Sequence, residues 1–250
     1  AKAILAFLAE TGACPVETLA LEVPRPQETL RRLIKAGLVS QEERPRQPEE
    51  VLGTWSPQEK APLLLSPDQA QACQAISDAL GENRFAPFLL HGVTASGKTE
   101  VYLQAAEKAL ELGKGVLVLL PEIALTDPVG KAFRQRFGPR VALLHSGLSP
   151  RSRLEQWRRL AVGDMDIAVG ARSAVFAPVA NLGLIVVDEE HDPAYKNEGG
   201  LPYQARDAAL YRGQLAGAAV VLGSATPAVT TFYRAQAGKY HYLRMPQRVT

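Results

Sequence analysis

A phosphate-binding loop between a strand and a helix is the feature of this sequence that most constrains its fold. The residues Gly92-Val-Thr-Ala-Ser-Gly-Lys-Thr99 follow the apolar run Phe88–His91 and precede the helix-forming stretch Glu100–Leu112. Loops of the pattern G-x-x-x-x-G-K-[ST] curl so that backbone N–H groups point at phosphate oxygens, and the helix that follows adds its partial positive charge. We therefore expect Lys98 to reach the β- and γ-phosphates of a nucleotide and the Thr99 hydroxyl to join a Mg²⁺ shell.

Short apolar runs alternate with helical stretches from about residue 63 onward. The runs are continuous rather than alternating, which is typical of strands buried on both faces of a parallel sheet. These runs are Phe88–His91, Gly115–Leu120, Val141–Leu144, Ile167–Gly170, Leu182–Asp188 and Ala219–Gly223. With helices between them, they predict a three-layer α/β domain, a P-loop nucleotide-binding lobe over residues 63–250.

An acidic group must accompany a phosphate loop in order to hold Mg²⁺ and orient water. The run Leu184-Ile-Val-Val-Asp-Glu-Glu-His191 supplies one at the carboxyl end of a predicted strand, where ligands gather in open α/β sheets. We expect Asp188 to coordinate Mg²⁺ and Glu189 to act as the general base for the attacking water. Together with Lys98, they are the predicted catalytic residues. Gly223-Ser-Ala-Thr-Pro227 follows the last predicted strand, and its hydroxyl groups could bond the acidic loop, but the segment taken alone is better explained as a plain turn.

Residues 1–43 predict a small domain of three short helices followed by a strand. The third helix ends at Gly37, and the strand starts at Leu38–Val39. This order is that of a winged helix, whose third helix can enter a major groove with Arg31 and Arg32. A winged helix that packs against protein explains the pattern equally well.

The distribution of charge says more than the net charge of +2. Residues 1–60 hold 8 Lys or Arg and 9 Asp or Glu, a balance of −1 that does not favour tight duplex binding. Residues 129–159 hold eight Lys or Arg against one Glu, a local +7. That block fits either a nucleic-acid footprint or a solvated helix face. Residues 44–62, rich in Pro, Glu and Gln, are predicted to be a linker.

Several classes of protein are excluded by the composition. No stretch approaches about 18 consecutive apolar residues, so we expect no membrane span. No basic segment leads into an apolar one as in a secretory signal. The two cysteines, Cys14 and Cys73, favour neither a disulfide framework nor a zinc site, and a cytosolic setting is the default. Because the chain begins with Ala1 inside an apolar periodic run, we expect it to be a piece of a longer protein.

Together these segments resemble the superfamily 2 helicases, which combine a phosphate loop, an Asp-Glu-x-His box and a Ser-Ala-Thr segment. The finer sequence resembles the PriA family of bacterial replication-restart helicases. The matching segments are Gly92–Tyr102, Leu120–Thr126, His145–Ser149, Gly170–Pro178, Asp188–Asp192, Ala205–Asp207 and Gly223–Pro227. The resemblance runs from about residue 65 to 237, and it implies a RecA-like first helicase lobe preceded by a winged helix.

The resemblance also implies ATP and Mg²⁺ as cofactors. In this family a Gln before the phosphate loop reads adenine, and Gln69 stands at that place. The residues thus expected at the nucleotide are Gln69, Gly92, Thr94, Ser96, Gly97, Lys98, Thr99, Glu190 and His191, with Thr99 and Asp188 as Mg²⁺ ligands. The family's second lobe, DNA-end-binding domain and zinc-binding cysteines have no counterpart here, so zinc is expected in the longer family members and not in this chain.

For activity, the resemblance implies ATP-driven 3′-to-5′ unwinding at stalled or repaired forks and assembly of the primosome. The implied partners are forked or branched DNA, single-stranded DNA, single-strand binding protein and primosome proteins, in the cytoplasm at the nucleoid and away from membranes. Residues 192–204 resemble the family's aromatic-rich loop, which couples DNA contact to the ATP site by sequence-tolerant stacking. The residues expected to contact DNA are Arg31, Arg32, Thr126, Arg172, Tyr195, Tyr203 and Arg206.

Two segments depart from the family pattern. Ala95 stands where the family usually has Gly, which strains the loop if that position needs a positive φ. Residues 199–204 are less basic and less aromatic than expected. These departures favour a second hypothesis, a DNA-binding primosome scaffold whose ATPase is impaired. A small-molecule P-loop kinase is a third, but it leaves the acidic box and the Ser-Ala-Thr segment unexplained.

Overall fold

The computed structural model describes residues 4–5, 7–8, 12, 26–40, 64–121, 128–145 and 147–249. The chain divides into two compact units, residues 1–53 and 54–250. Among the helices of these described residues, none is long and apolar enough to cross a bilayer.

In the first unit, helix α3 (Pro26–Lys35) ends as the sequence predicts. Gly37 adopts a left-handed φ of +69°, and the Leu38 amide donates to the Leu33 carbonyl at 3.0 Å. The small core of this unit contains Ile4, Leu30 and Leu33. The strand predicted at Leu38–Val39 is wrong, because the backbone turns there instead. Since much of this unit lies outside the described residues, the winged helix stays a prediction.

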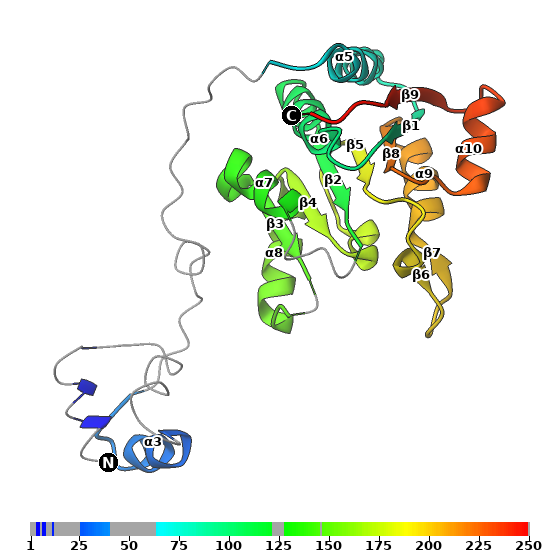
Figure 1. The fold of residues 1–250 in the computed structure, drawn as a ribbon. Coiled ribbons are helices and arrows are strands. Elements are labelled where there is room, and N and C mark those ends of the chain that lie inside the picture. The colour runs from blue at the N-terminus through cyan, green and yellow to red at the C-terminus, as the bar shows by residue number, and fades with distance from the viewer. Residues whose placement is uncertain are drawn as a thin grey trace. The chain divides into compact units, whose positions relative to one another are not determined.

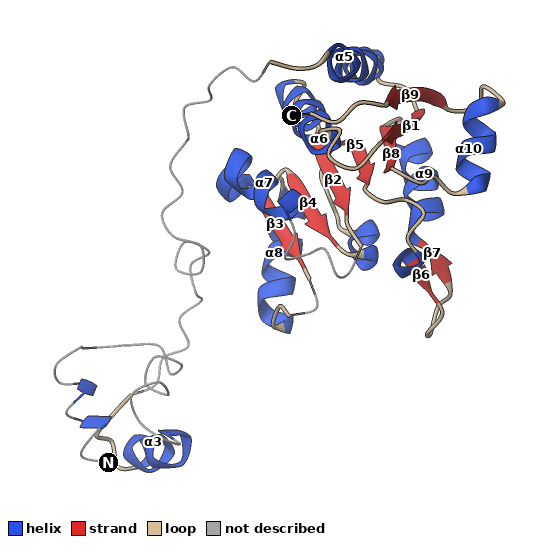
Figure 2. Cartoon of the chain, in the orientation of Figure 1, coloured by secondary structure: helices blue, strands red, loops and turns tan. Residues whose placement is uncertain are grey.

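A seven-stranded parallel sheet forms the centre of the second unit (Figures 1 and 2). Its strands are β1 (Ala86–Gly92), β2 (Gly115–Leu119), β3 (Val141–Leu144), β4 (Ile167–Gly170), β5 (Leu182–Val187), β8 (Ala219–Ser224) and β9 (His241–Met245). They lie side by side in the order β3-β4-β2-β5-β8-β1-β9, and every neighbouring pair is parallel. All six strands predicted from the apolar runs are confirmed. The RecA-like α/β fold class is confirmed with them.

Strand β9 is the one strand of this sheet that the sequence did not reveal. It lies at the edge, pairs only with β1, and alternates exposed and buried residues over His241–Met245. One face of β9 is solvated, so its sequence lacks the continuous apolar run of the other strands, including β3 at the opposite edge, whose residues are mostly buried.

Helices cover both faces of this sheet. They are α5 (Pro67–Glu82), α6 (Lys98–Glu111), α7 (Pro128–Phe137), α8 (Pro150–Val162), α9 (Ala205–Ala216) and α10 (Val229–Gln236). Short elements complete the chain: η2 (Gly138–Arg140), η3 (Arg172–Phe176), η4 (Pro193–Tyr195), and the antiparallel pair β6 (Lys196–Asn197) and β7 (Tyr203–Gln204). Residues of α5, α6 and α7 pack in one core cluster, and residues of α8 and α9 in a second. Successive residues of β2 alternate between them, since Val116 and Val118 join the first and Leu117 and Leu119 the second.

The strand order determines where a ligand can be handled. The strands β5, β8 and β1 are neighbours and run in the same direction, so their carboxyl ends meet at one edge of the sheet. The phosphate loop follows β1, the acidic box follows β5, and the Ser-Ala-Thr segment ends β8 between them. Three segments far apart in the sequence are thereby brought together.

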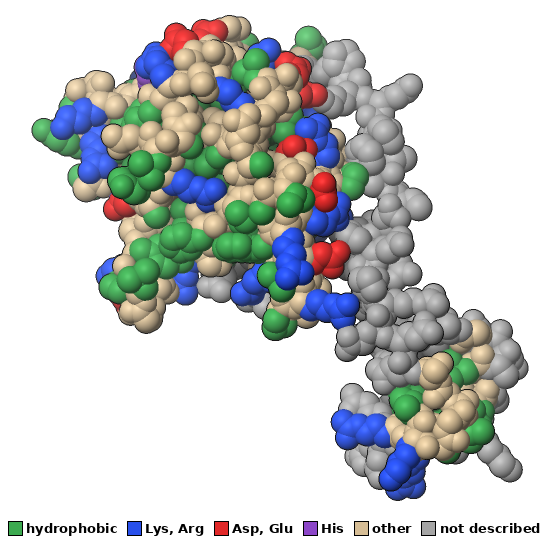
Figure 3. Space-filling view, turned by 180° about the vertical axis from the view of Figure 1, so that it is seen from behind, with side chains coloured by type: hydrophobic (Ala, Val, Ile, Leu, Met, Phe, Trp, Pro, Cys, Tyr) green, Lys and Arg blue, Asp and Glu red, His purple; other side chains and the backbone are tan. Residues whose placement is uncertain are grey.

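The basic block of residues 129–159 is partly neutralised. Arg136 is mostly buried and pairs with Glu100 at 3.0 Å and with Glu107 at 3.6 Å. Arg140 pairs with Asp166 at 2.6 Å. On the face seen in Figure 3, Lys and Arg side chains are interspersed with other kinds and form no continuous patch. For Arg136 these contacts favour a structural role over a nucleic-acid footprint, whereas Arg140 lies half exposed in a surface ion pair.

Candidate active site

The phosphate loop connects β1 to α6 with the backbone that its glycines predict. At Gly92 a Cβ atom would lie 2.5 Å from the Ser96 hydroxyl oxygen. Gly97 has a φ of +81°, and a Cβ there would lie 2.2 Å from the side-chain nitrogen of Gln69. Gly97 is required by its left-handed backbone, while at Gly92 a side chain would displace the Ser96 hydroxyl from its place in the loop.

Two polar groups of this loop are buried with hydrogen-bonding capacity that the protein does not fully satisfy. The Ser96 hydroxyl is buried and has no hydrogen-bond partner. The Lys98 ammonium, also buried, donates to the Gly92 carbonyl at 2.9 Å. Thr99 follows in the first turn of α6, and Thr94 is exposed at the tip of the loop. An unpartnered hydroxyl beside a buried ammonium at a helix N-terminus fits a nucleotide phosphate.

Ala95 does occupy a position that needs a positive φ. Its φ is +63°, in the left-handed region. For a residue with a Cβ this conformation costs about 1–2 kcal/mol. The Ala95 carbonyl accepts a hydrogen bond from the Val249 amide at 2.9 Å, which ties the end of the chain to the loop. The loop therefore keeps its shape in spite of the substitution, at a cost in strain.

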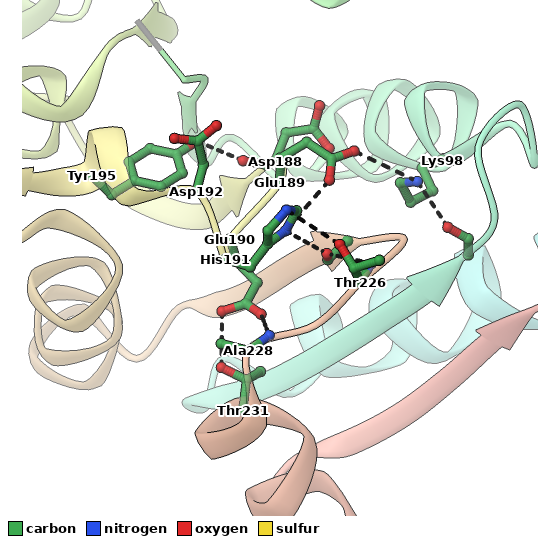
Figure 4. A network of polar contacts seen from close by, with 12 residues as sticks. Lys98, Asp188, Glu189, Glu190, His191, Asp192, Tyr195, Thr226, Ala228 and Thr231 are labelled. Atoms are coloured by element: carbon green, nitrogen blue, oxygen red, sulfur yellow. Dashed lines mark hydrogen bonds and ion pairs between the residues drawn. The ribbon is translucent and has the colours of Figure 1, made fainter.

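The acidic box places two carboxylates differently. Asp188 at the end of β5 accepts a hydrogen bond from the Tyr102 hydroxyl at 2.9 Å, and burial raises the pKa of its carboxyl. Glu189 has a left-handed φ of +44° and is 37% exposed. One of its oxygens lies 3.9 Å from the Lys98 ammonium, and the other lies 3.6 Å from a His191 nitrogen. Glu189 thus bridges the phosphate loop and the rest of the box (Figure 4).

His191 contacts the end of β8. Its Nδ1 lies 2.8 Å from the Ser224 hydroxyl, and its Nε2 lies 3.2 Å from the Thr226 hydroxyl. Hydrogen bonds between the Ser-Ala-Thr segment and the acidic loop are therefore present, so the segment is more than a plain turn. Because both ring nitrogens of His191 are engaged there, its contact with nucleotide stays a prediction that requires an exchange of these bonds.

Glu190 points away from the phosphate loop, which corrects its predicted nucleotide contact (Figure 4). Its carboxylate is fully buried. It accepts from the Ala228 amide at 2.7 Å, from the Thr231 hydroxyl at 2.9 Å and from the Arg206 guanidinium at 3.1 Å. These donors belong to the start of α10 and of α9, so Glu190 holds the box against two helices. Arg206, expected at DNA, also pairs with Asp207.

Tyr195 does not offer a stacking surface. Its side chain is fully buried, and its hydroxyl lies 2.6 Å from the Asp188 carbonyl oxygen and 2.9 Å from that of Leu119. The predicted base stacking on Tyr195 is therefore wrong. Tyr203 is half-buried and packs edge to face against Phe176, with ring centroids 5.1 Å apart.

The other predicted DNA contacts lie on separate elements. Arg172 donates to the Lys196 carbonyl at 2.8 Å and so ties η3 to the segment of residues 192–204. Arg31 and Arg32 are exposed on α3. Thr126 lies outside the described residues. Contact of these residues and of Tyr203 with DNA stays a prediction.

Gln69 lies against the phosphate loop. Its side-chain oxygen accepts from the Ser66 amide at 2.8 Å, as part of a capping box that starts α5. Its side-chain nitrogen donates to the Gly97 carbonyl at 3.3 Å. Both ends of the amide are engaged, so adenine recognition by Gln69 stays a prediction that requires an exchange of these bonds.

Tyr102 is the residue that sequence reasoning missed. It is fully buried, and burial raises the pKa of its hydroxyl well above the ordinary value, so the hydroxyl is protonated and donates to Asp188. The sequence does indicate that Tyr102 lies near the site, because it is four residues after Lys98 and residues four apart share one face of a helix.

A magnesium ion fits the donors present. The Thr99 hydroxyl and the Asp188 carboxylate are the oxygen ligands that Mg²⁺ prefers, and it takes only one or two carboxylates beside phosphates and water. Among the described residues no group of three or more His, Cys, Asp or Glu side chains could hold a metal.

The fold and these three loops define a nucleotide-binding lobe of the superfamily 2 helicase type. The chain belongs to the DEAD/DEAH box helicase family, whose model matches residues 66–234. Two solved structures share the fold. RecG bound to a three-way DNA junction matches with a TM-score of 0.53 and 22% sequence identity, over 76% of this chain and 25% of that one. A hypothetical ATP-dependent RNA helicase from Sulfolobus tokodaii matches with a TM-score of 0.52 and 18% sequence identity, over 74% of this chain and 53% of that one.

Among curated proteins, the resemblance to PriA is confirmed. Replication restart protein PriA of Bacillus subtilis is 42% identical over 99% of this chain, and that of Chlamydia pneumoniae is 48% identical over 75%. PriA of Synechocystis is 39% identical over 100% of the chain. The chain spans only 25% to 31% of the length of these relatives.

Proposed function

We propose that this chain supplies the first motor lobe of an ATP-dependent DNA helicase that unwinds DNA 3′ to 5′ and restarts replication at stalled or repaired forks. The observation that carries the proposal is the meeting of three loops: Lys98 of the phosphate loop lies 3.9 Å from Glu189, and the acidic box bonds the end of β8 through His191. The relatives named replication restart protein PriA support the assignment to replication restart.

Each residue at the site has a role in this proposal. Lys98 holds the β- and γ-phosphates, and backbone amides of the loop bind the remaining phosphate oxygens. Thr99 and Asp188 hold magnesium, which neutralises charge on the phosphates when it is bound. Glu189 orients the attacking water and accepts its proton, since it lies beside the phosphate loop and is partly open to solvent.

The partners and setting of this function belong to the same proposal. The chain works in the bacterial cytoplasm at the nucleoid, on forked, branched and single-stranded DNA, with single-strand binding protein and primosome proteins. The relatives' shared name, replication restart protein PriA, supports a setting in DNA replication, and the partners follow from the resemblance to that family. Unwinding requires the opposing half of the ATP site, so this chain alone binds nucleotide and does not unwind DNA.

One observation favours a second function, a DNA-binding primosome scaffold with an impaired ATPase. The φ of +63° at Ala95 strains the loop that must cradle the phosphates. The intact Lys98, Asp188 and Glu189 argue for the motor. DNA-stimulated ATP hydrolysis by the longer protein distinguishes the motor from the scaffold. A rate of ATP hydrolysis that does not change when forked DNA is added supports the scaffold.

Calorimetric binding of Mg-ADP to the 250-residue chain tests the nucleotide site. Lys98→Ala removes the ammonium beside the phosphates and should abolish measurable binding. Lys108→Ala is the matched control, because this lysine lies on the same helix and pairs at the surface with Glu111 at 3.1 Å. Equal affinity in the Lys98→Ala and unmodified chains would contradict the proposal.

A further inference from the structure

Tyr102 connects the phosphate-loop helix to the acidic box. It lies on α6 one turn after Lys98, and its ring is buried in the core cluster that α5, α6 and α7 share with the sheet. The hydroxyl at the end of this buried ring reaches the Asp188 carboxylate at 2.9 Å. An apolar core otherwise surrounds the ring, so Asp188 is the acceptor that satisfies this hydroxyl.

Gly223 on β8 leaves the space that the Tyr102 hydroxyl occupies. A Cβ at Gly223 would lie 1.7 Å from that hydroxyl, 2.9 Å from the ring carbon that carries it and 3.4 Å from Asp188 Oδ1. The hydroxyl therefore occupies the space that a side chain at Gly223 would fill. Helix α6 and the ends of β5 and β8 meet at this single hydrogen bond.

We infer that Tyr102 is a positioning residue that holds one oxygen of the Asp188 carboxylate, so that the other oxygen is offered to magnesium. A carboxylate that is fixed before the metal binds loses less rotational freedom on binding. Ligating carboxylates are held in this way in other metal sites, and loss of such a partner lowers metal affinity by about tenfold or more. This inference rests on the proposed nucleotide site.

The test compares ADP binding with and without magnesium in the unmodified 250-residue chain and in Tyr102→Phe. The ring stays and only the hydroxyl is lost. We expect the ratio of the two affinities, the magnesium enhancement, to fall by about tenfold in Tyr102→Phe while the affinity for ADP in EDTA is unchanged. Tyr211→Phe, an exposed tyrosine on α9, is the control and should keep the full enhancement.

A double-mutant cycle shows whether Tyr102 acts through Asp188. Asp188→Ala should remove the enhancement, and adding Tyr102→Phe to it should change nothing more. An undiminished enhancement in Tyr102→Phe, or an equal loss of affinity in EDTA, overturns the inference and leaves the Lys98-dependent site intact. Binding that does not depend on Lys98 overturns the proposed function itself. Thermal unfolding of each variant confirms that the chain under test is folded.

Discussion

At the scale of single residues, the site combines two backbone positions that ordinarily favour glycine. Ala95 and Glu189 both have left-handed φ angles, of +63° and +44°. Such strain persists where the surrounding structure over-determines the conformation, and it gathers at functional sites. Ala95 lies in the phosphate loop itself, and Glu189 lies in the acidic box 3.9 Å from Lys98 of that loop, so both strained positions belong to the segments that form the proposed site.

Ala95→Gly should relieve part of this strain. We expect the free energy of unfolding to rise by about 0.5–1 kcal/mol, since the left-handed penalty disappears while the unfolded chain gains freedom. Urea unfolding measures the change. Ala70→Gly in the exposed face of α5 is the matched control and should lower the same free energy by about 1 kcal/mol. Equal destabilisation by both substitutions would show that position 95 is not strained.

The direction of individual side chains is the part of the site that the sequence could not supply. Lys98, Asp188 and Glu189 were assigned correctly to one place because a motif specifies which strand ends carry them. Glu190 was expected at the nucleotide as part of the acidic box that resembles the family. The left-handed turn at Glu189 sends the two carboxylates opposite ways, and nothing in the local pattern predicts that turn at a glutamate.

At the scale of elements, buried polar bonds join the helices to the acidic box. Glu190 receives donors from the start of α9 and from the start of α10. Tyr195 bonds the main chain at Asp188 from η4. The segment between β5 and α9 is therefore anchored at both ends to the box, which offers a route by which contact at this segment reaches the ATP site.

Glu190→Ala should destabilise the lobe by about 3–5 kcal/mol, because it leaves the Arg206 guanidinium and the Ala228 amide without their buried partner. Urea denaturation of the chain measures this loss. Glu198→Ala breaks an exposed pair with Lys196 in the same region and should leave stability unchanged. A loss as small as that of the control would mean that the Glu190 bonds carry little of the stability.

Elements themselves were well predicted where burial is two-sided. The continuous apolar runs predicted the bounds of β1, β2, β3, β4, β5 and β8 to within a residue or two. Such continuous runs are typical of strands that are covered on both faces. Strand β9 was missed for the complementary reason. The expected strand at Leu38–Val39 failed because two apolar residues after a helix stop also suit a turn.

At the scale of the whole molecule, the two units have separate cores. Ile4, Leu30 and Leu33 form the core of the first, and both large clusters belong to residues 54–250. All the nucleotide contacts proposed above lie in the second unit. Stability and nucleotide binding should therefore be properties of that unit.

We predict that a chain of residues 54–250 keeps the thermal unfolding midpoint of the lobe and the Mg-ADP affinity of the entire chain. Calorimetric unfolding and binding measure both quantities. The reason is that none of the residues before 54 that the structure describes contributes to either large core cluster. A drop in midpoint or affinity on removal of residues 1–53 would show that the first unit supports the site.

The close approach of Tyr102 to Gly223 limits which pairs of residues related proteins can have at these two positions. A methyl group at position 223 would occupy the volume of the Tyr102 hydroxyl, so a larger residue at 223 is tolerated only where the tyrosine at 102 is lost. Homologous sequences with a larger residue at 223 should have lost the tyrosine at 102, and the two positions should therefore covary across the family although they lie 121 positions apart in the chain.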